Sequence, residues 1–397
     1  MMSVWSSLVG QEAAVAKLSE AAASARAIVA SRGGAHASDD ARSMSHAWLI
    51  TGPPGSGRSV AARAFAAALQ CTGEEPGCGA CPGCRTTMAR TNADVVFAAT
   101  ETSIINVETA RSLVLQAQSS PSQGLWRVIV VEDADRLGES GANALLKAIE
   151  EPPEHTVWLL CAPSPEDMIA TIRSRCRHLG LRIPTATAVA DLLVHEGVAT
   201  PEVALEAARA AQSHIGLARA LARDPQMRER RRNIITAPAS VRSVGEAVMA
   251  ADRLLETAKA QADAQVSDRN AREKADLLRQ LGMEEGESAT KASRAMLRQL
   301  EEDQKRRSKR ALTDAIDRAL IDLLAIYRDV LMVQVGGDGE LINTDLSELV
   351  HQIAHDSTPH QTLARVDHIE TARKRLVANG NPLLVLEDMA ISLRPQA

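Results

Sequence analysis

Aromatic side chains are scarce in this sequence of 397 residues, at 2% of the chain, although hydrophobic residues make up 45%. Its cores must therefore be built from Ala, Leu, Val and Ile, a composition that favours packed helices. A sandwich of many short strands would need more aromatic and β-branched residues. The length is enough for two or three domains.

Long apolar runs and a positive net charge are also missing. No run reaches the 18 apolar residues of a membrane-spanning helix, so we expect no membrane partner. The stretch MMSVWSSLVGQEAAVAKL lacks the basic-then-apolar order of a secretory signal, and we expect a cytoplasmic protein. A formal net charge of −5 excludes a global positive field that would attract nucleic acid. A role on DNA would depend on a local patch or on partner proteins.

Four of the six cysteines lie close together, at Cys71, Cys78, Cys81 and Cys84. Without an export signal, structural disulfides are not expected. The spacing C-x6-C-x2-C-x2-C, with Gly and Pro between the cysteines, lets a short loop fold back so that four thiolates close a tetrahedral site. We predict a structural Zn²⁺ there. An iron–sulfur cluster and free thiols in a mobile loop are the alternatives.

The first 183 residues alternate between strand and helix patterns. Short buried strands are predicted at HAWLIT (46–51), RVIVVE (127–132) and TVWLLC (156–161). Between them, Asn106 is placed to cap one helix and Pro152 to end another. Such alternation is typical of a parallel sheet covered by helices on both faces.

Strand patterns disappear after residue 183. We expect a small helical domain over 184–227 and a larger one over 228–397, so the predicted fold class is α/β followed by all-α. The charged stretch 262–310 is either a long solvated helical arm or partly disordered. Its basic run KRRSKR (305–310) could contact DNA, but a solvated helix face is the commoner origin of such a run.

A glycine-rich segment, GPPGSGRS (52–59), follows a predicted strand and precedes a helix, as a phosphate-binding loop does. Gly52, Gly55 and Gly57 allow backbone N–H groups to point at phosphate oxygens, and Ser59 stands at the hydroxyl position. Arg58 replaces the lysine that reaches the β- and γ-phosphates. Because a guanidinium is planar and bulkier than an ammonium, we expect weak ATP or ADP binding at most. An ordinary Gly/Pro turn is the alternative.

The acidic pair that ATP hydrolysis requires is present in reversed order. Glu132-Asp133 follows the second apolar strand, where Asp and then Glu would hold the Mg²⁺ shell and orient the attacking water. The reversal changes the reach at both positions by one methylene. ATP hydrolysis requires the metal and the attacking water to be placed closely, so we expect no hydrolysis with this reversed pair.

Taken together, HAWLITGPPGSGRS, the four-cysteine insertion, NALLKAIEEPPEHTVWLL and TIRSRCRHLGL resemble the clamp-loader branch of the AAA+ superfamily over residues 5–182. IGLARALA (215–222) resembles the sensor-2 helix of that family, with Arg219 at the sensor-2 position. The resemblance implies a RecA-like domain with a zinc module (71–84) over 1–183, a helical lid over 184–227 and a helical collar over 228–397. The carboxy-terminal half matches only in being helical.

Two subunit types of the bacterial DNA polymerase III clamp loader have this arrangement: the ATP-hydrolysing gamma/tau type and the stationary delta prime type. Arg58 and the reversed acidic pair favour the second, as does Ala162-Pro163, which offers no hydroxyl at the sensor-1 position. Arg175 in SRC is retained, and the resemblance implies that it acts as an arginine finger in a neighbouring subunit's ATP site. A local ion pair is the alternative for both Arg175 and Arg219.

The resemblance therefore implies a subunit without catalytic activity of its own. It would complete a pentamer with gamma/tau and delta subunits and support loading of the sliding clamp on primed DNA. One alternative is an ATP-driven motor of the gamma/tau type. Another is a free-standing zinc-dependent nucleic-acid-binding protein, which is disfavoured because the cysteine cluster lacks adjacent aromatic residues or a basic run.

Overall fold

The computed structural model describes residues 3–30, 43–98, 105–283 and 291–394. The chain divides into two compact units, Met1–Arg219 and Ala220–Ala397, which are described separately below. The division into three domains with boundaries after 183 and 227 stays a prediction. None of the described helices is both long and apolar enough to cross a membrane.

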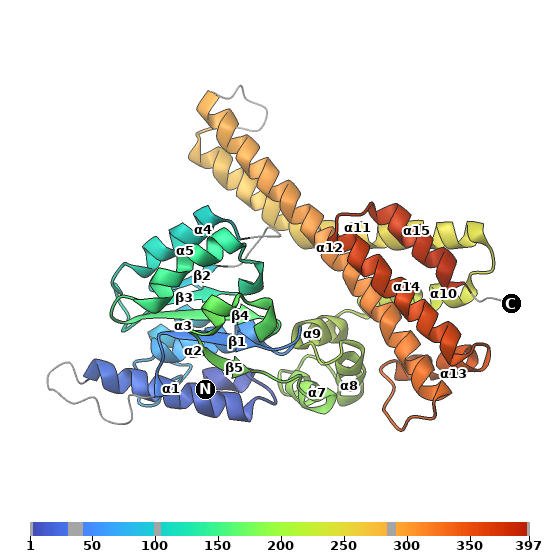
Figure 1. Ribbon diagram of the computed structural model, residues 1–397, viewed down its shortest axis with the longest axis horizontal. Coiled ribbons are helices and arrows are strands. Elements are labelled where there is room, and N and C mark those ends of the chain that lie inside the picture. Colours follow the sequence, from blue (N-terminus) through green and yellow to red (C-terminus); the bar gives the residue numbers. More distant parts are fainter. Residues whose placement is uncertain (1–2, 31–42, 99–104, 284–290, 395–397) are drawn as a thin grey trace. The chain divides into compact units, whose positions relative to one another are not determined.

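Five parallel strands form the sheet of the first unit, in the order β2-β3-β4-β1-β5 (Figure 1). Their bounds are β1 (Ala47–Thr51), β2 (Val95–Ala98), β3 (Arg127–Val131), β4 (Thr156–Ala162) and β5 (Arg177–Gly180). Pattern analysis predicts β1, β3 and β4 but not β2 or β5. Each of the two missed strands has only four residues: β2 is an apolar run too short to distinguish a strand by pattern, and Leu179 is the one buried side chain of β5.

Helices cover both faces of the sheet, and alternate strand residues face two separate cores. Trp48 and Val128 pack with α1 and α2, whereas Leu49 and Ile129 pack with α4 and α5. The bounds are α1 (Glu12–Ala30), α2 (Arg58–Leu69), α3 (Pro82–Met88), α4 (Val107–Ala117), α5 (Glu139–Glu150) and α6 (Ala170–Arg173), with short 3-10 helices η1 (Val4–Ser7), η3 (Ala134–Arg136) and η4 (Pro165–Asp167). The predicted α/β architecture is confirmed.

Two helix ends lie where the sequence predicts them, at the start of α4 and at the end of α5. The Oδ1 atom of Asn106 accepts a hydrogen bond from the backbone N–H of Thr109 at 2.8 Å, which caps α4. Helix α5 ends at Glu150, before the two prolines. A small helical group follows the sheet and consists of α7 (Ala186–His195), α8 (Pro201–Ala210) and α9 (Ile215–Arg223), the last of which crosses the boundary between the units.

The second unit is helical throughout its described residues, which confirms the all-α part of the fold. It comprises α10 (Pro225–Ser240), α11 (Val244–Gln280), α12 (Lys291–Gln334), η5 (Thr344–Leu346), α13 (Ser347–His355), α14 (Pro359–Val377) and α15 (Pro382–Leu393). Helices α11 and α12 run side by side and extend together as an arm (Figure 1). Residues 262–280 and 291–310 belong to this arm and are helical, as the first of the two alternatives predicts.

Contacts along the arm change from apolar near its base to polar farther out. Ala262, Val266 and Ala311 pack together. Farther along, the Nη1 atom of Arg307 donates to Asn270 Oδ1 at 2.7 Å and to Glu273 Oε2 at 2.8 Å. The arm therefore has little apolar core and depends on polar pairing between its two helices.

A buried carboxylate fixes the loop that leads into β3. Asp94 is fully buried and accepts hydrogen bonds from the backbone N–H groups of Ser122, Gln123 and Gly124 at 2.6 to 2.8 Å. It also accepts one from the Ser122 hydroxyl at 2.9 Å. Burial opposes ionisation of Asp94, but these donors outweigh it and lower its pKa.

We expect Asp94→Asn to lower the free energy of unfolding at neutral pH by about 1–3 kcal/mol, because an amide group would set an N–H donor against backbone donors. The folded-state pKa lies below the unfolded value of about 3.9, so this stabilisation is present at neutral pH. It should be lost as the pH falls below about 4 and through the folded-state pKa. Urea unfolding of both proteins across this pH range measures the difference. The exposed Asp191→Asn is the control, and an equal loss in the two variants would contradict the prediction.

Candidate functional site

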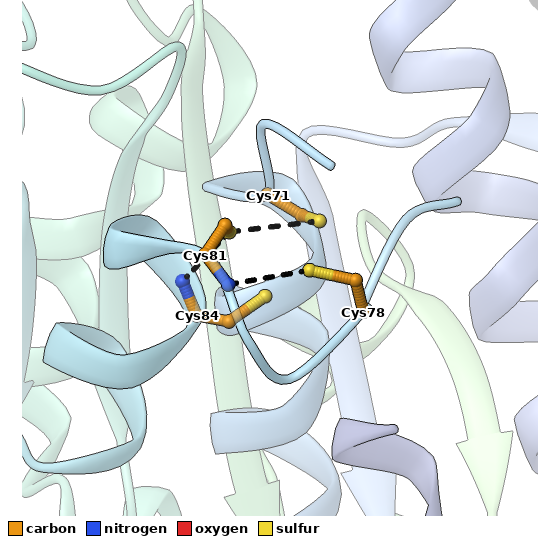
Figure 2. A group of neighbouring side chains, drawn as sticks. All are labelled: Cys71, Cys78, Cys81 and Cys84. Atoms are coloured by element: carbon orange, nitrogen blue, oxygen red, sulfur yellow. Dashed lines mark hydrogen bonds between the residues drawn. The ribbon is translucent and has the colours of Figure 1, made fainter. Parts of the chain in front are cut away.

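The four clustered cysteines point toward one another (Figure 2). Their sulfur atoms all lie within 4.8 Å of one another. Cys71 follows the end of α2, Cys81 is the N-cap of α3 and Cys84 lies in its first turn. Four sulfurs at 2.3 Å from a tetrahedral zinc would be about 3.8 Å apart, so a small contraction closes the site. The predicted residues are brought together, and the cluster could hold a metal ion.

Backbone N–H groups favour the thiolate form at this cluster. The Sγ atom of Cys81 accepts from the N–H groups of Cys84 at 3.4 Å and Thr72 at 3.5 Å, and Cys78 Sγ accepts from Cys81 N–H at 3.4 Å. Burial opposes ionisation of Cys81, but these hydrogen bonds lower its pKa to about 6. Burial raises the pKa of Cys84, which is fully buried. A metal ion bound here would offset the cost of burying several thiolates together.

The amino-terminal segment holds the cysteine loop in shape. Trp5 Nε1 donates to the carbonyl of Pro76 at 3.2 Å, and Arg26 Nη2 donates to the carbonyl of Cys71 at 3.0 Å. Gly77 has a φ of 88°, and a Cβ there would lie 2.7 Å from Trp5 Nε1. These supporting contacts come from residues far away in the sequence, which the cysteine spacing does not reveal.

We expect about one metal ion per chain to copurify with the wild-type protein, because the four thiols leave no ligand position open. Cys81→Ser should lose the ion and increase amide hydrogen exchange over 71–84, while the parallel sheet stays folded. Elemental analysis and exchange mass spectrometry measure the two effects. Cys176→Ser is the matched control outside the cluster. Metal-free protein prepared without chelator, with all four thiols freely alkylated, would contradict the site.

The glycine-rich segment forms a loop between β1 and α2. Gly55 and Gly57 have φ values of 91° and 89°, which favour glycine. A Cβ at Gly52 would lie 2.5 Å from Ser56 Oγ, and one at Gly55 would lie 2.9 Å from the Cα atom of His214. The loop is therefore tightly enclosed, on one side by the turn between α8 and α9.

Two arginines pair with the groups that the sequence predicts for binding a nucleotide and its metal. Arg58 Nη1 donates to the carbonyl oxygen of Gly52, so its guanidinium folds back onto its own loop. Glu132, directly after β3, pairs with Arg90 Nη2 at 2.6 Å. Asp133 lies within 4.0 Å of Arg136. These residues do not fit a Mg²⁺–ATP complex, which needs a free cation for phosphate and a free carboxylate for the metal.

Arg90 and Arg63 are the members of this site that sequence reasoning missed. Arg90 is 42 residues from Glu132 and belongs to no motif, so no sequence signal connects the two. Arg63 lies one turn into α2, where burial and the positive charge of Arg90 lower its pKa. Arg63 and Arg90 therefore join Arg58 at this site, and the motif predicts only Arg58 of these three.

Arg175 and Arg219 both make local ion pairs. Arg175 follows α6 and pairs with Glu150 at the end of α5, and its Nη1 atom also donates to the carbonyl of Thr171 at 2.8 Å. Arg219 makes a two-pronged pair with Glu196 at 2.8 and 2.9 Å. The Arg175 side chain is 39% exposed and that of Arg219 is 32% exposed. These partners lie outside the glycine loop, and both roles implied by the resemblance stay predictions.

Comparison with known proteins agrees with the resemblance. Residues 36–185 match the family model described as DNA polymerase III, delta subunit. Over these residues the chain is similar to clamp-loader subunits of DNA polymerase III. The resemblance stated from the motifs is thereby confirmed.

The similar relatives in this clamp-loader family are of two kinds. DNA polymerase III subunit gamma/tau of Mycobacterium tuberculosis is 35% identical over 147 residues, which cover 36% of this chain and 25% of that protein. DNA polymerase III subunit delta' of Pseudomonas aeruginosa is 34% identical over 167 residues, 41% of this chain and 50% of that protein. The delta' subunit of Yersinia pestis is 37% identical over 143 residues, 35% and 42% of the two chains. The chain thus spans a quarter to a half of these clamp-loader proteins, and identity does not distinguish the two kinds.

Proposed function

We propose that the chain is a delta prime-type subunit of a DNA polymerase III clamp loader, a stator that does not hydrolyse ATP. The observation that supports this is the contrast between two arginines. Arg58 is folded onto the carbonyl of Gly52 within its own phosphate loop, whereas Arg175 is exposed next to β5, an edge strand of the sheet. The phosphate loop of this chain is altered, while Arg175, which would act in the ATP site of a neighbouring subunit, is accessible.

In this proposal Arg175 enters the ATP site of a neighbouring gamma/tau subunit. It must first leave Glu150, and an exposed ion pair of this kind is worth only about 0.2–1 kcal/mol. A γ-phosphate in a site closed to water is a stronger partner for a guanidinium. Arginine fingers in phosphoryl transfer contribute on the order of 10³–10⁵ in rate.

The remaining parts follow the family pattern. Residues 184–227 act as the lid, and 228–397 act as the collar through which the chain joins gamma/tau and delta subunits in a pentamer. The assembly opens the sliding clamp and places it on primed DNA. The cysteine cluster holds a structural Zn²⁺, and ATP or ADP binds weakly if it binds at all.

A second candidate is an ATP-hydrolysing motor of the gamma/tau type. It is favoured by the similarity to gamma/tau relatives, at 35% identity, which matches that to the delta' relatives. ATP hydrolysis by the isolated chain separates the two candidates.

We expect the isolated chain to show no ATPase activity above background, because the phosphate loop and the acidic pair are both altered. Arg58→Lys should not rescue turnover, since the order of Glu132 and Asp133 is unchanged. Phosphate release by the wild type, Arg58→Lys and Ser59→Ala tests this. Robust release by the wild type that Ser59→Ala abolishes would favour the motor.

We expect Arg175→Ala to reduce DNA- and clamp-stimulated ATP hydrolysis and clamp loading in a loader reconstituted with gamma/tau and delta subunits. The total loss should be well below the full contribution of one finger, because other sites in the pentamer keep theirs. Folding, metal content and pentamer formation should be unchanged.

Arg173→Ala is the matched control, since Arg173 is an exposed arginine two residues earlier in the same segment. Glu150→Gln, which releases Arg175, should leave loading intact. Wild-type rates for Arg175→Ala would mean that Arg175 serves only its ion pair with Glu150.

A further inference from the structure

We propose that Arg90 is a resident cation that takes the place of the Mg²⁺ ion at Glu132, so that the site rejects metal-bound nucleotide independently of Arg58. The proposal concerns the same site as the proposed function and rests on it. It names a second determinant, which lies outside every motif in the sequence. The glycine loop and Arg58 act on the phosphates, whereas Arg90 acts on the metal.

Three contacts hold Arg90 in position. Its backbone ends α3 in the left-handed conformation, with a φ of 60°, and its N–H donates to the carbonyl of Thr87 at 3.0 Å. Its guanidinium lies 5.1 Å from the ring centroid of Phe97 on β2. Its Nη2 atom is 2.6 Å from Glu132 Oε1. The guanidinium is thus held next to Glu132 by contacts of the chain itself.

Glu132 is the partner that a metal would need. It follows β3 at the carboxyl edge of the sheet, and its side chain is only 13% exposed. A Mg²⁺ ion prefers six oxygen ligands in octahedral geometry and binds proteins through one or two carboxylates. A carboxylate that is already paired with a guanidinium has lost much of its attraction for a second cation, and the like charges repel.

A further positive charge near Glu132 adds to the repulsion of a divalent cation. Arg63 lies close enough to Arg90 and Glu132 that both act on its charge. An incoming divalent ion would therefore meet the positive charge of Arg63 as well as that of Arg90.

Arg58 and Arg90 are separate obstacles, because they contact different atoms. Arg58 binds the carbonyl of Gly52 in the loop, and Arg90 binds the carboxylate after β3. Restoring lysine at 58 improves the phosphate site but leaves Glu132 occupied. The Mg²⁺ dependence of nucleotide binding should return only when both arginines are replaced.

The experiment measures the affinity of the full chain for a fluorescent ATP analogue in excess MgCl₂ and in EDTA. In the wild type and in Arg58→Lys the two dissociation constants should agree within about twofold. In Arg58→Lys/Arg90→Asn we expect binding at least about tenfold tighter with Mg²⁺, a change of about 1.4 kcal/mol. Asparagine is chosen because it tolerates the left-handed backbone and is too short to reach Glu132.

Arg58→Lys/Arg85→Asn is the matched control, since Arg85 is an exposed arginine on α3, the helix that precedes Arg90. If the asparagine variant does not fold, Arg90→Gly removes the same charge at a backbone position that glycine adopts readily. The proposal is overturned if Arg58→Lys alone or the control gains the same Mg²⁺ dependence. It is also overturned if a folded double variant shows none.

Pentamer assembly distinguishes failure of this inference from failure of the proposed function. If the wild-type chain assembles with gamma/tau and delta subunits and shows no ATPase activity, but the double variant gains no Mg²⁺ dependence, only the role of Arg90 is wrong. If the wild-type chain hydrolyses ATP, or binds the analogue in a strongly Mg²⁺-dependent way, both are wrong.

Discussion

The parallel alignment of β1, β3 and β4 is the constraint on which the whole site depends. Because the strands run in one direction, their carboxyl ends meet at the same edge of the sheet. This brings the glycine loop after β1, Glu132 after β3 and Pro163 after β4 to one place, although they are far apart in the sequence. The backbone N–H of Gly52 even donates to the carbonyl of Pro163 at 3.1 Å. The edge keeps the shape of a nucleotide site while its charged groups pair with one another.

Helix α3 connects the cysteine cluster to this edge. Its first turn contains Cys84, with Cys81 as its N-cap, and Arg90 follows its C-cap Ala89. The cysteine cluster and the partner of Glu132 therefore lie at the two ends of one short helix.

The ion pairs of this chain differ in what they can do, because they differ in exposure. Asp94 is fully buried, and its hydrogen bonds to Ser122, Gln123 and Gly124 hold the loop before β3. Glu132 is largely buried, whereas the Arg90 side chain that pairs with it is 42% exposed and also lies over the ring of Phe97. The pair of Arg175 with Glu150 is exposed on both sides and is weak, which leaves Arg175 available for another partner.

The sequence by itself determined the features that depend on near neighbours. The cap at Asn106, the end of α5 before its prolines, the glycine loop and the cysteine cluster all involve residues within about one loop of each other, so spacing and residue type were enough. The order of strand and helix patterns likewise gave the α/β part followed by helices. Only the tertiary structure decided β2 and β5, because each has four residues, too few to distinguish a strand by pattern. The partners of Glu132 and Arg175 also required it, because contacts between residues 42 and 25 positions apart follow from how the elements pack and leave no trace in local composition.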